Sequence, residues 1–153
     1  MSPSTIILNR RLKRRSNQKF LVLLLSANER NRLRGRCKST CGQELLLQLP
    51  REGPLIDGEV LIGKNPLPEV LVKAAIENLI VVRAQSILEL TQAAYHLGNR
   101  HVDLELHTKE LFLLEDPVLT RMLINRRLSV KKIKKPFFPE LGAYSQAHSH
   151  NNS

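Results

Sequence analysis

The spacing of apolar residues predicts two regions of different architecture along this chain. Up to about residue 75, apolar residues form short runs separated by turn-forming residues, a pattern typical of a small β-barrel or β-sandwich. The predicted strands cover 20–25, 44–49, 59–62 and 69–75. Ser26 and Glu29 stand at capping-box spacing, which predicts a single helical turn after the first of these strands. The N-terminal region is therefore expected to be all-β.

From residue 76 the pattern alternates between strand-like and helix-like segments. Strands are predicted over 78–84, 102–106, 110–114 and 129–134. Ser86 is a suitable N-cap for a helix that ends at Gly98-Asn99, and Asp116 followed by Pro117 is a typical start of a second helix. The resulting order of strand, helix, strand, strand, helix, strand is that of a ferredoxin-like βαββαβ domain.

We therefore predict an α+β chain with three parts. An N-terminal all-β domain covers residues 1–75, a ferredoxin-like domain covers 76–138, and a disordered C-terminal tail covers 139–153, where small and polar residues dominate. Two domains of this size would each have a marginal hydrophobic core, which makes an oligomer a reasonable expectation.

The net charge of the chain indicates which classes of binding partner it favours. The chain has 24 Lys and Arg against 14 Asp and Glu, a formal charge of +10, which favours polyanions or acidic proteins. The basic run at 10–15 is expected to be a loop or an exposed strand end. The basic runs at 30–36 and 126–135 are expected to be solvated faces, with docking to acidic protein or RNA as their functional interpretation. Aromatic residues make up only 4% of the chain and Trp is absent, so few side chains could stack on bases.

Compartment can be inferred from the cysteines and the apolar runs. Cys37 and Cys41 are too few for a disulfide framework and are expected to be a pair of loop cysteines. No apolar run approaches the ~20 residues that span a bilayer. The run at 20–25 is also shorter than a signal-peptide core of ~7–15 residues. We therefore predict a cytoplasmic protein that is not associated with a membrane.

The histidines are the candidate chemical groups. No catalytic triad, phosphate-binding loop, dinucleotide motif or zinc framework is present, so we do not expect an enzyme. His101 follows the Gly98-Asn99 break and could be a metal ligand, or a surface or helix-capping residue. On the axis of a two-fold dimer, one exposed histidine supplies two ligands, and His148 and His150 in the tail could add more. Nickel accepts such imidazole ligands.

Three ordered groups of residues resemble one known family, the urease accessory protein UreE. The most specific is the nine-residue stretch AAYHLGNRH that ends at His101. A second group lies in the N-terminal half, at Arg34-Gly35-Arg36, Gly42, Leu49-Pro50, Gly53, Leu55 and 57–61. A third precedes the tail histidines, at Phe137, Pro139-Glu140 and Gly142-Ala143-Tyr144. Together they cover nearly the whole chain.

The resemblance implies a nickel metallochaperone. It implies an N-terminal domain that engages partners and a ferredoxin-like domain that forms a head-to-head homodimer. Paired His101 residues would then bind one Ni(II) cargo ion, and His148 and His150 would supply additional ligands. The implied partners are the accessory GTPase UreG and the urease apoprotein. The tail has only the sequence His-Ser-His, which favours transfer of one ion over nickel storage.

Competing metals and two other functions stay open at this point. Zn(II) or Cu(II) could compete for an imidazole site, since the Irving–Williams order favours copper. The ferredoxin-like order and the positive charge also fit a small basic RNA-binding module, although nucleic acid is not expected because its base-stacking aromatic motif is missing. A metal-free interaction adaptor is the third alternative.

Overall fold

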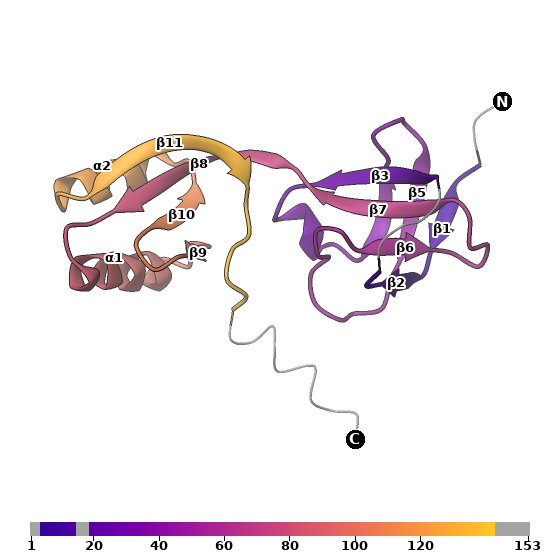
Figure 1. Ribbon diagram of the computed structural model, residues 1–153, viewed down its shortest axis with the longest axis horizontal. Helices are drawn as coiled ribbons and strands as arrows, with labels where there is room; N and C mark the ends of the chain where they lie inside the picture. The colour runs from indigo at the N-terminus through magenta and orange to yellow at the C-terminus, as the bar shows by residue number, and fades with distance from the viewer. Residues whose placement is uncertain (1–3, 15–18, 143–153) are drawn as a thin grey trace, which may run out of the picture. The chain divides into compact units, whose positions relative to one another are not determined.

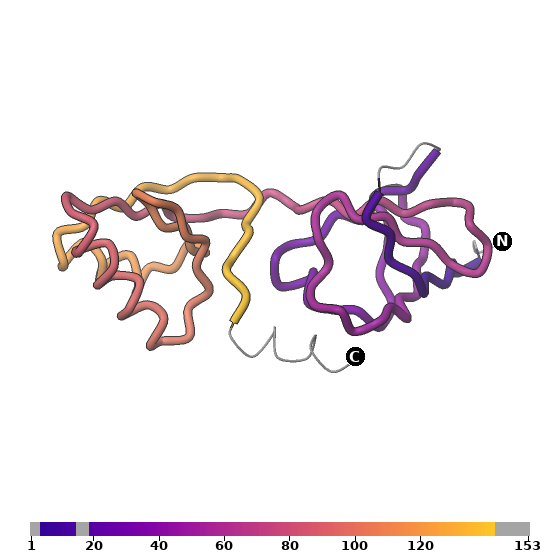
Figure 2. Tube along the Cα trace, turned by 60° about the horizontal axis from the view of Figure 1, so that its bottom comes forward, coloured from indigo at the N-terminus to yellow at the C-terminus, as the bar shows by residue number. Residues whose placement is uncertain are grey.

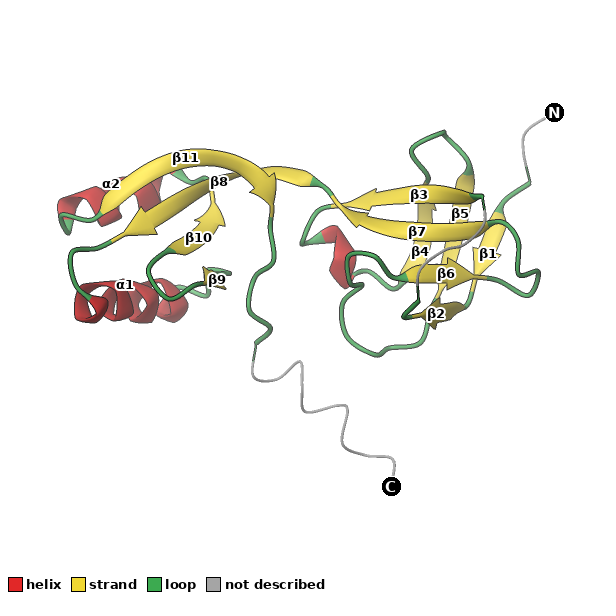
Figure 3. Ribbon diagram, viewed as in Figure 1, coloured by secondary structure: helices red, strands yellow, loops and turns green. Residues whose placement is uncertain are grey.

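The computed structural model describes residues 4–14 and 19–142 of the chain. It divides into two compact units, with the boundary between Ala75 and Ile76, and each is described by itself (Figure 1). Strands dominate the first unit, while both α-helices belong to the second (Figure 3). Neither helix in the described parts of the chain is long and apolar enough to cross a membrane.

The first unit consists of two β-sheets around one core. The three-stranded sheet has the order β1-β5-β4, and the four-stranded sheet has the order β2-β6-β7-β3. The strands are β1 (Ile6–Leu8), β2 (Arg10–Leu12), β3 (Phe20–Leu25), β4 (Arg34–Lys38), β5 (Glu44–Gln48), β6 (Val60–Ile62) and β7 (Glu69–Ala74). Leu8 and Leu45 from one sheet and Leu23, Leu61 and Val70 from the other belong to the same buried cluster. The predicted all-β domain is confirmed.

Strands β1 and β4 were not predicted, and β2 was expected only as a loop or an exposed strand end. Charged residues hide the alternation in β2 and β4, whereas β1 is only three apolar residues long. In β4 the side chains of Arg34, Arg36 and Lys38 are exposed, while Gly35 and Cys37 between them are half-buried. The interpretation of 30–36 as a solvated face therefore holds for the arginines of this edge strand, but it is wrong for Arg30, which is only 5% exposed. Strands β1 and β2 are equally short and lie at sheet edges.

The basic run at 10–15 also contains a buried arginine. Arg11 on β2 forms a two-point ion pair with Glu59, with Nε–Oε1 and Nη2–Oε2 distances of 2.8 and 3.1 Å. Their side chains are only 4% and 2% exposed. Arg11 also donates to the carbonyl oxygens of Gly53 and Pro54, and Glu59 accepts the N–H of Ile56. This network ties β2 to the loop that precedes β6.

The second unit has the predicted ferredoxin-like order. Its elements are β8 (Ile76–Arg83), α1 (Ile87–Asn99), β9 (Glu105–Leu106), β10 (Leu111–Leu114), α2 (Pro117–Asn125) and β11 (Ser129–Pro136). The sheet order is β11-β8-β10-β9, and every pair is antiparallel. Strand β9 is shorter than the predicted 102–106, because Val102 instead completes the end of α1 by donating to the carbonyl oxygen of Leu97.

Both faces of this sheet bury apolar side chains near its centre. Ile80, Val82, Leu111 and Leu113 alternate onto one face and join Leu97 of α1 in the main core. The opposite face carries Leu79, Val81 and Phe112, which are at most 6% exposed. After β11 the chain turns back toward β9 (Figures 1 and 2). Phe137 on this returning segment is also buried.

The predicted helix starts are confirmed by their caps. The Ser86 hydroxyl accepts the N–H of Glu89 at 3.2 Å, and the Asp116 carboxylate accepts the N–H of Leu119 at 3.0 Å. Pro117 occupies the first turn of α2, as predicted. Ser26 and Glu29 also exchange the two hydrogen bonds of a capping box. These local signals fix where the helices begin.

Candidate metal-binding site

His101 occupies a left-handed backbone position at the end of α1. Its φ is +58°, a conformation that usually belongs to glycine. Its N–H donates to the carbonyl oxygen of Gly98 at 3.0 Å, and the N–H of Val102 donates to Leu97 at 3.1 Å. These two bonds form a Schellman motif. The sequence placed the helix break at Gly98-Asn99, but Gly98 stays inside the helix and His101 makes the turn.

The same turn ends α2, which shows that the backbone geometry alone is not a functional signal. Arg127 has φ +63°, and the N–H of Leu128 donates to the carbonyl oxygen of Leu123. What distinguishes His101 is the side chain at that position. Its imidazole is exposed and makes no hydrogen bond or ion pair with the described residues. The turn thus leaves an exposed imidazole at the end of α1 with no polar partner among the described residues.

The other described histidines are engaged elsewhere. His96 is half-buried in α1, where its ring makes an edge contact with Tyr95 at 5.5 Å. His107 is exposed, and its Nε2 lies 2.6 Å from Glu105 Oε2. Within residues 4–14 and 19–142, no three His, Cys, Asp or Glu side chains gather to hold a metal ion. The predicted ligands His148 and His150 lie outside the described residues.

A buried carboxylate near His101 is the feature that sequence reasoning missed. Glu105 is 5% exposed, and its Oε2 lies 2.6 Å from both Lys135 Nζ and His107 Nε2. Its Oε1 accepts the N–H of Phe138 at 2.8 Å. Burial alone would raise the pKa of Glu105, but these hydrogen bonds and the Lys135 charge together lower it below its usual range. Because these partners are 30 and 33 residues away, no local pattern could reveal them.

The two cysteines are free and chemically different. Cys37 was expected in a loop but lies on β4, where burial raises the pKa of its thiol. Cys41 is exposed, and a hydrogen bond with the Ser39 hydroxyl at 3.1 Å lowers the pKa of its thiol. Neither thiol forms part of a metal-binding group within the described residues.

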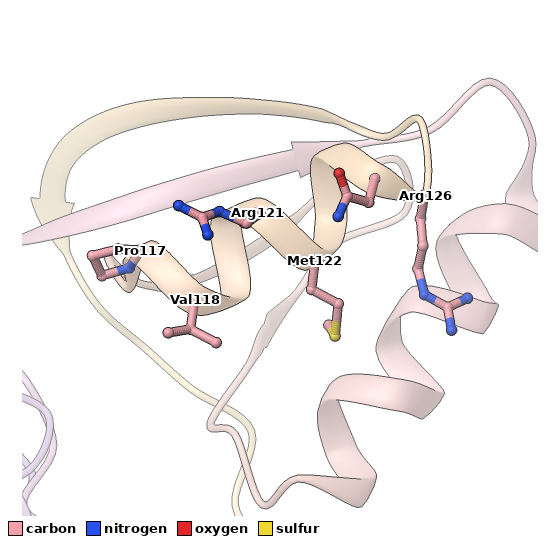
Figure 4. Close-up of a pocket in the computed structure, with 6 residues that line it drawn as sticks. Pro117, Val118, Arg121, Met122 and Arg126 are labelled. Carbon is pink, nitrogen blue, oxygen red and sulfur yellow. The ribbon is translucent and has the colours of Figure 1, made fainter.

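An open hollow of about 540 Å³ lies beside α2 (Figure 4). Its lining residues are Pro117, Val118, Arg121, Met122, Asn125 and Arg126. Met122 and Arg126 extend from the same side of the helix in this view. The lining offers no imidazole, thiolate or carboxylate, which are the common ligands for transition metals. The hollow is therefore not a candidate for the metal site.

Fold and site together define a two-domain α+β protein with a histidine presented by its ferredoxin-like domain. The chain matches "UreE urease accessory protein, N-terminal domain" over residues 4–65 and "UreE urease accessory protein, C-terminal domain" over residues 77–153. The chain therefore belongs to the UreE urease accessory protein family.

Two curated relatives show how far the similarity extends. The chain is 50% identical to the urease accessory protein UreE of Parasynechococcus marenigrum (strain WH8102) over 150 residues, 98% of this chain and 99% of the relative. It is 58% identical to the urease accessory protein UreE of Synechococcus sp. (strain WH7805) over 130 residues, 85% of this chain and 74% of the relative. The similarity thus covers both units.

Proposed function

We propose that this protein is a homodimeric nickel metallochaperone that donates Ni(II) during assembly of the urease metallocentre. His101 from each subunit binds the ion at the dimer interface, and His150 and His148 of the tails complete its ligands. The partners implied by this role are the GTPase UreG and the urease apoprotein. Family membership supports the link to urease. The observation that carries the metal-binding role is the imidazole of His101, which is exposed and has no polar partner among residues 4–14 and 19–142.

A shared site is favoured by the ligand count. His101 is the only member of the described histidines that is both exposed and without a polar side-chain partner. One imidazole binds a metal weakly, whereas two-fold symmetry brings a second copy of the same residue to the same ion. A site with open positions also releases its ion more readily than a closed four-ligand cage. Release is the property that a carrier needs.

Chain geometry allows the tail histidines to reach His101. The N–H of Glu140 donates to the carbonyl oxygen of Leu104 at 2.7 Å. Leu104 follows His101 by three residues, so the two lie within about 11 Å. Glu140 lies about one strand spacing, roughly 5 Å, from Leu104. The Cα atoms of Glu140 and His101 are therefore within about 16 Å of each other. Eight residues connect Glu140 to His148, and a chain of that length spans at most about 28 Å.

Binding should depend on pH and compete with other metals. Imidazole binds a metal only in its neutral form, so nickel affinity is expected to fall on acidification. Zn(II) and Cu(II) use the same ligand type, and copper is expected to bind at least as tightly in vitro. Selectivity in the cell would then follow from metal supply and from the partner that receives the ion.

The opposite face of the sheet gives no support to the RNA-binding alternative. RNA-binding domains of this topology stack bases on exposed aromatic residues of that face. Here Phe112 is 5% exposed, with Lys135 Nζ 3.8 Å from its ring centroid and His107 against its edge. The excess of basic over acidic residues also lies mainly in residues 1–75, outside the ferredoxin-like unit.

The test is a nickel titration of His101→Ala in the full chain, with His96→Ala as the matched control. We expect His101→Ala to lose the tightest site while circular dichroism and thermal unfolding stay close to those of the native protein. His96 is engaged within α1, so its replacement should leave nickel affinity unchanged. Native affinity in His101→Ala would remove the proposal.

A further inference from the structure

Strand β4 of the first unit has a free edge, and its basic residues direct their backbone groups toward it. In the described part of the chain, β4 ends its sheet and pairs only with β5 (Figure 3). On either side of β4, the carbonyl oxygen of Leu33 and the N–H of Ser39 bond to residues next to β5. Alternate residues of an antiparallel strand direct both backbone groups to the same side. The positions that face away from β5 are therefore Arg34, Arg36 and Lys38.

The open part of this edge is short, with a hydrogen bond at each end. At one end Arg32 Nε donates to the carbonyl oxygen of Arg34 at 3.3 Å. The guanidinium fits there because a Cβ on Gly35 would lie 2.6 Å from Arg32 Nη2. At the other end the N–H of Thr40 donates to Val22 of β3 at 2.8 Å. Between them, the outward N–H groups of the three basic residues have no partner among residues 4–14 and 19–142. The opening fits one extended segment about as long as β4, which has five residues.

The side chains of the same three residues make this edge positively charged. All three are exposed, and because they alternate along a strand they lie on one face at a spacing of about 7 Å. Neither Arg34 nor Lys38 forms an ion pair with another residue that the structure describes. Arg36 has only the exposed 3.8 Å pair with Glu44, and exposed pairs contribute little. The three cations are therefore available to carboxylates of a partner.

We propose that the free edge of β4 binds an extended, acidic segment of a partner protein, which joins the sheet as an additional strand. The backbone of the segment pairs with the outward groups of β4, and carboxylates at every second residue meet the three cations. An extended segment repeats its side chains on one face at the spacing of these cations. A helix instead places neighbouring side chains three and four residues apart. The inference goes beyond the proposed function, because it concerns the first unit and needs no metal.

Two other occupants fit this edge less well. A second copy of β4 would bring like charges opposite each other, which destabilises a strand pair. The charges that discourage pairing with a basic edge favour pairing with an acidic one. RNA phosphates would satisfy the cations, but β1, β4 and β5 contain no aromatic residue on which a base could stack. RNA would also leave the outward N–H groups without the regular acceptors that a strand supplies.

The experiment measures fluorescence anisotropy of a labelled peptide in which glutamate and threonine alternate. It uses the full chain without nickel, at about 150 mM salt to screen non-specific attraction. One control peptide has the same composition with its glutamates in adjacent pairs, which breaks the alternation. A second is N-methylated, so that it keeps its charges but loses its backbone donors. A uridine oligomer is the RNA probe.

Two sets of variants separate charge from backbone pairing. Arg34→Thr combined with Lys38→Thr removes two exposed cations from β4, and Lys131→Thr combined with Lys134→Thr removes two exposed cations from β11 as the matched control. Arg36→Pro is compared with Arg36→Thr, because both lose the charge and only proline loses the outward N–H. Proline is tolerated on an edge strand where its N–H would face solvent.

The alternating peptide should bind the native protein more tightly than either control peptide. We expect the β4 double variant to bind it about four- to 25-fold more weakly, or about two- to fivefold per cation. The β11 double variant should bind it as the native protein does. Arg36→Pro should bind it about two- to tenfold more weakly than Arg36→Thr, the effect of one lost hydrogen bond. All variants should keep the native oligomeric state.

Four results would overturn the proposal. The native protein could fail to bind the alternating peptide, or bind the N-methylated peptide equally well, which would mean that no strand is added. The β4 and β11 double variants could lose equal affinity, which would mean that only net charge matters. The uridine oligomer could bind more tightly than the peptide and depend on the β4 cations, which would make the edge an RNA site. A changed oligomeric state in the β4 double variant would make it a contact between copies of this chain.

Discussion

Replacement of His101 by glycine should make the protein more stable and remove its nickel site. The native φ of +58° at His101 is a left-handed conformation, which costs a residue with a side chain about 1–2 kcal/mol relative to glycine. Glycine relieves this cost because it has no Cβ. The imidazole contributes little to the fold in return, since it is exposed and unpartnered among the described residues.

The magnitude is the difference between two opposing effects. Glycine has more freedom in the unfolded chain, which lowers stability by about 0.4–1 kcal/mol. Histidine is also among the residues that tolerate the left-handed region better than most. A net gain of about 0.5–1 kcal/mol remains, which corresponds to about 2–8 °C in Tm for a domain of this size.

The assay is thermal unfolding without metal, followed by a nickel titration of the same samples. Arg127→Gly is the matched control, because Arg127 has φ +63° in the equivalent turn of α2. It should gain similar stability and keep native nickel affinity. His101→Ala should lose nickel binding without the gain in stability, since alanine retains a Cβ.

Two results would refute this reasoning. A loss of stability in His101→Gly would mean that the imidazole supports the fold. The left-handed backbone at this position would then not be a net cost to stability. Retention of the tightest nickel site in His101→Gly would mean that this residue is not the metal ligand.

Three further predictions concern other parts of the molecule. Glu59→Gln leaves the Arg11 charge buried without its partner, so urea unfolding should show a loss of about 3–5 kcal/mol. Cys41 should react with iodoacetamide near neutral pH faster than Cys37, as measured by peptide mass spectrometry, because the thiol pKa is lowered at Cys41 and raised at Cys37. The lowered carboxyl pKa of Glu105 stabilises the fold above the ordinary carboxyl pKa of about 4.3. This contribution to stability should disappear as pH falls through the folded-state pKa of Glu105. The urea midpoint of the native protein should therefore fall over this pH range by more than the midpoint of Glu105→Gln.

The ion-pair and cysteine predictions each have a matched control. Arg36 and Glu44 form an ion pair at 3.8 Å with side chains 76% and 43% exposed, so Arg36→Gln should cost no more than about 1 kcal/mol. Ser39→Ala should slow the reaction of Cys41, because it removes the hydrogen bond that lowers the thiol pKa. Equal costs for the two ion-pair variants, or an unchanged Cys41 rate in Ser39→Ala, would contradict these assignments.

The second unit could be predicted closely because its signals are local. Ser86 and Asp116 act within three residues of the N–H groups that they cap, and the apolar spacing of each helix repeats over a few turns. The strands β8 and β10 are buried on both faces, so their continuous apolar runs are visible in the sequence. The chain order of these elements then determined the topology.

The unpredicted features depend on contacts between distant residues. Strand β4 has a basic outer face because it lies at a sheet edge, a place where charged side chains also discourage pairing with other chains. Arg11 is buried only because Glu59, 48 residues away, lies opposite it. Glu105 likewise depends on Lys135 and on the N–H of Phe138. From the local sequence alone, charged side chains such as Arg11 and Glu105 are predicted to be exposed to solvent.

Native mass spectrometry during a nickel titration tests the central claim most directly, because it reports oligomeric state and bound ions together. The account predicts a dimer that first fills with one nickel ion, and a His101→Ala dimer that does not. The account would be contradicted if the native protein bound nickel as a monomer, or if it formed a dimer that stayed free of metal.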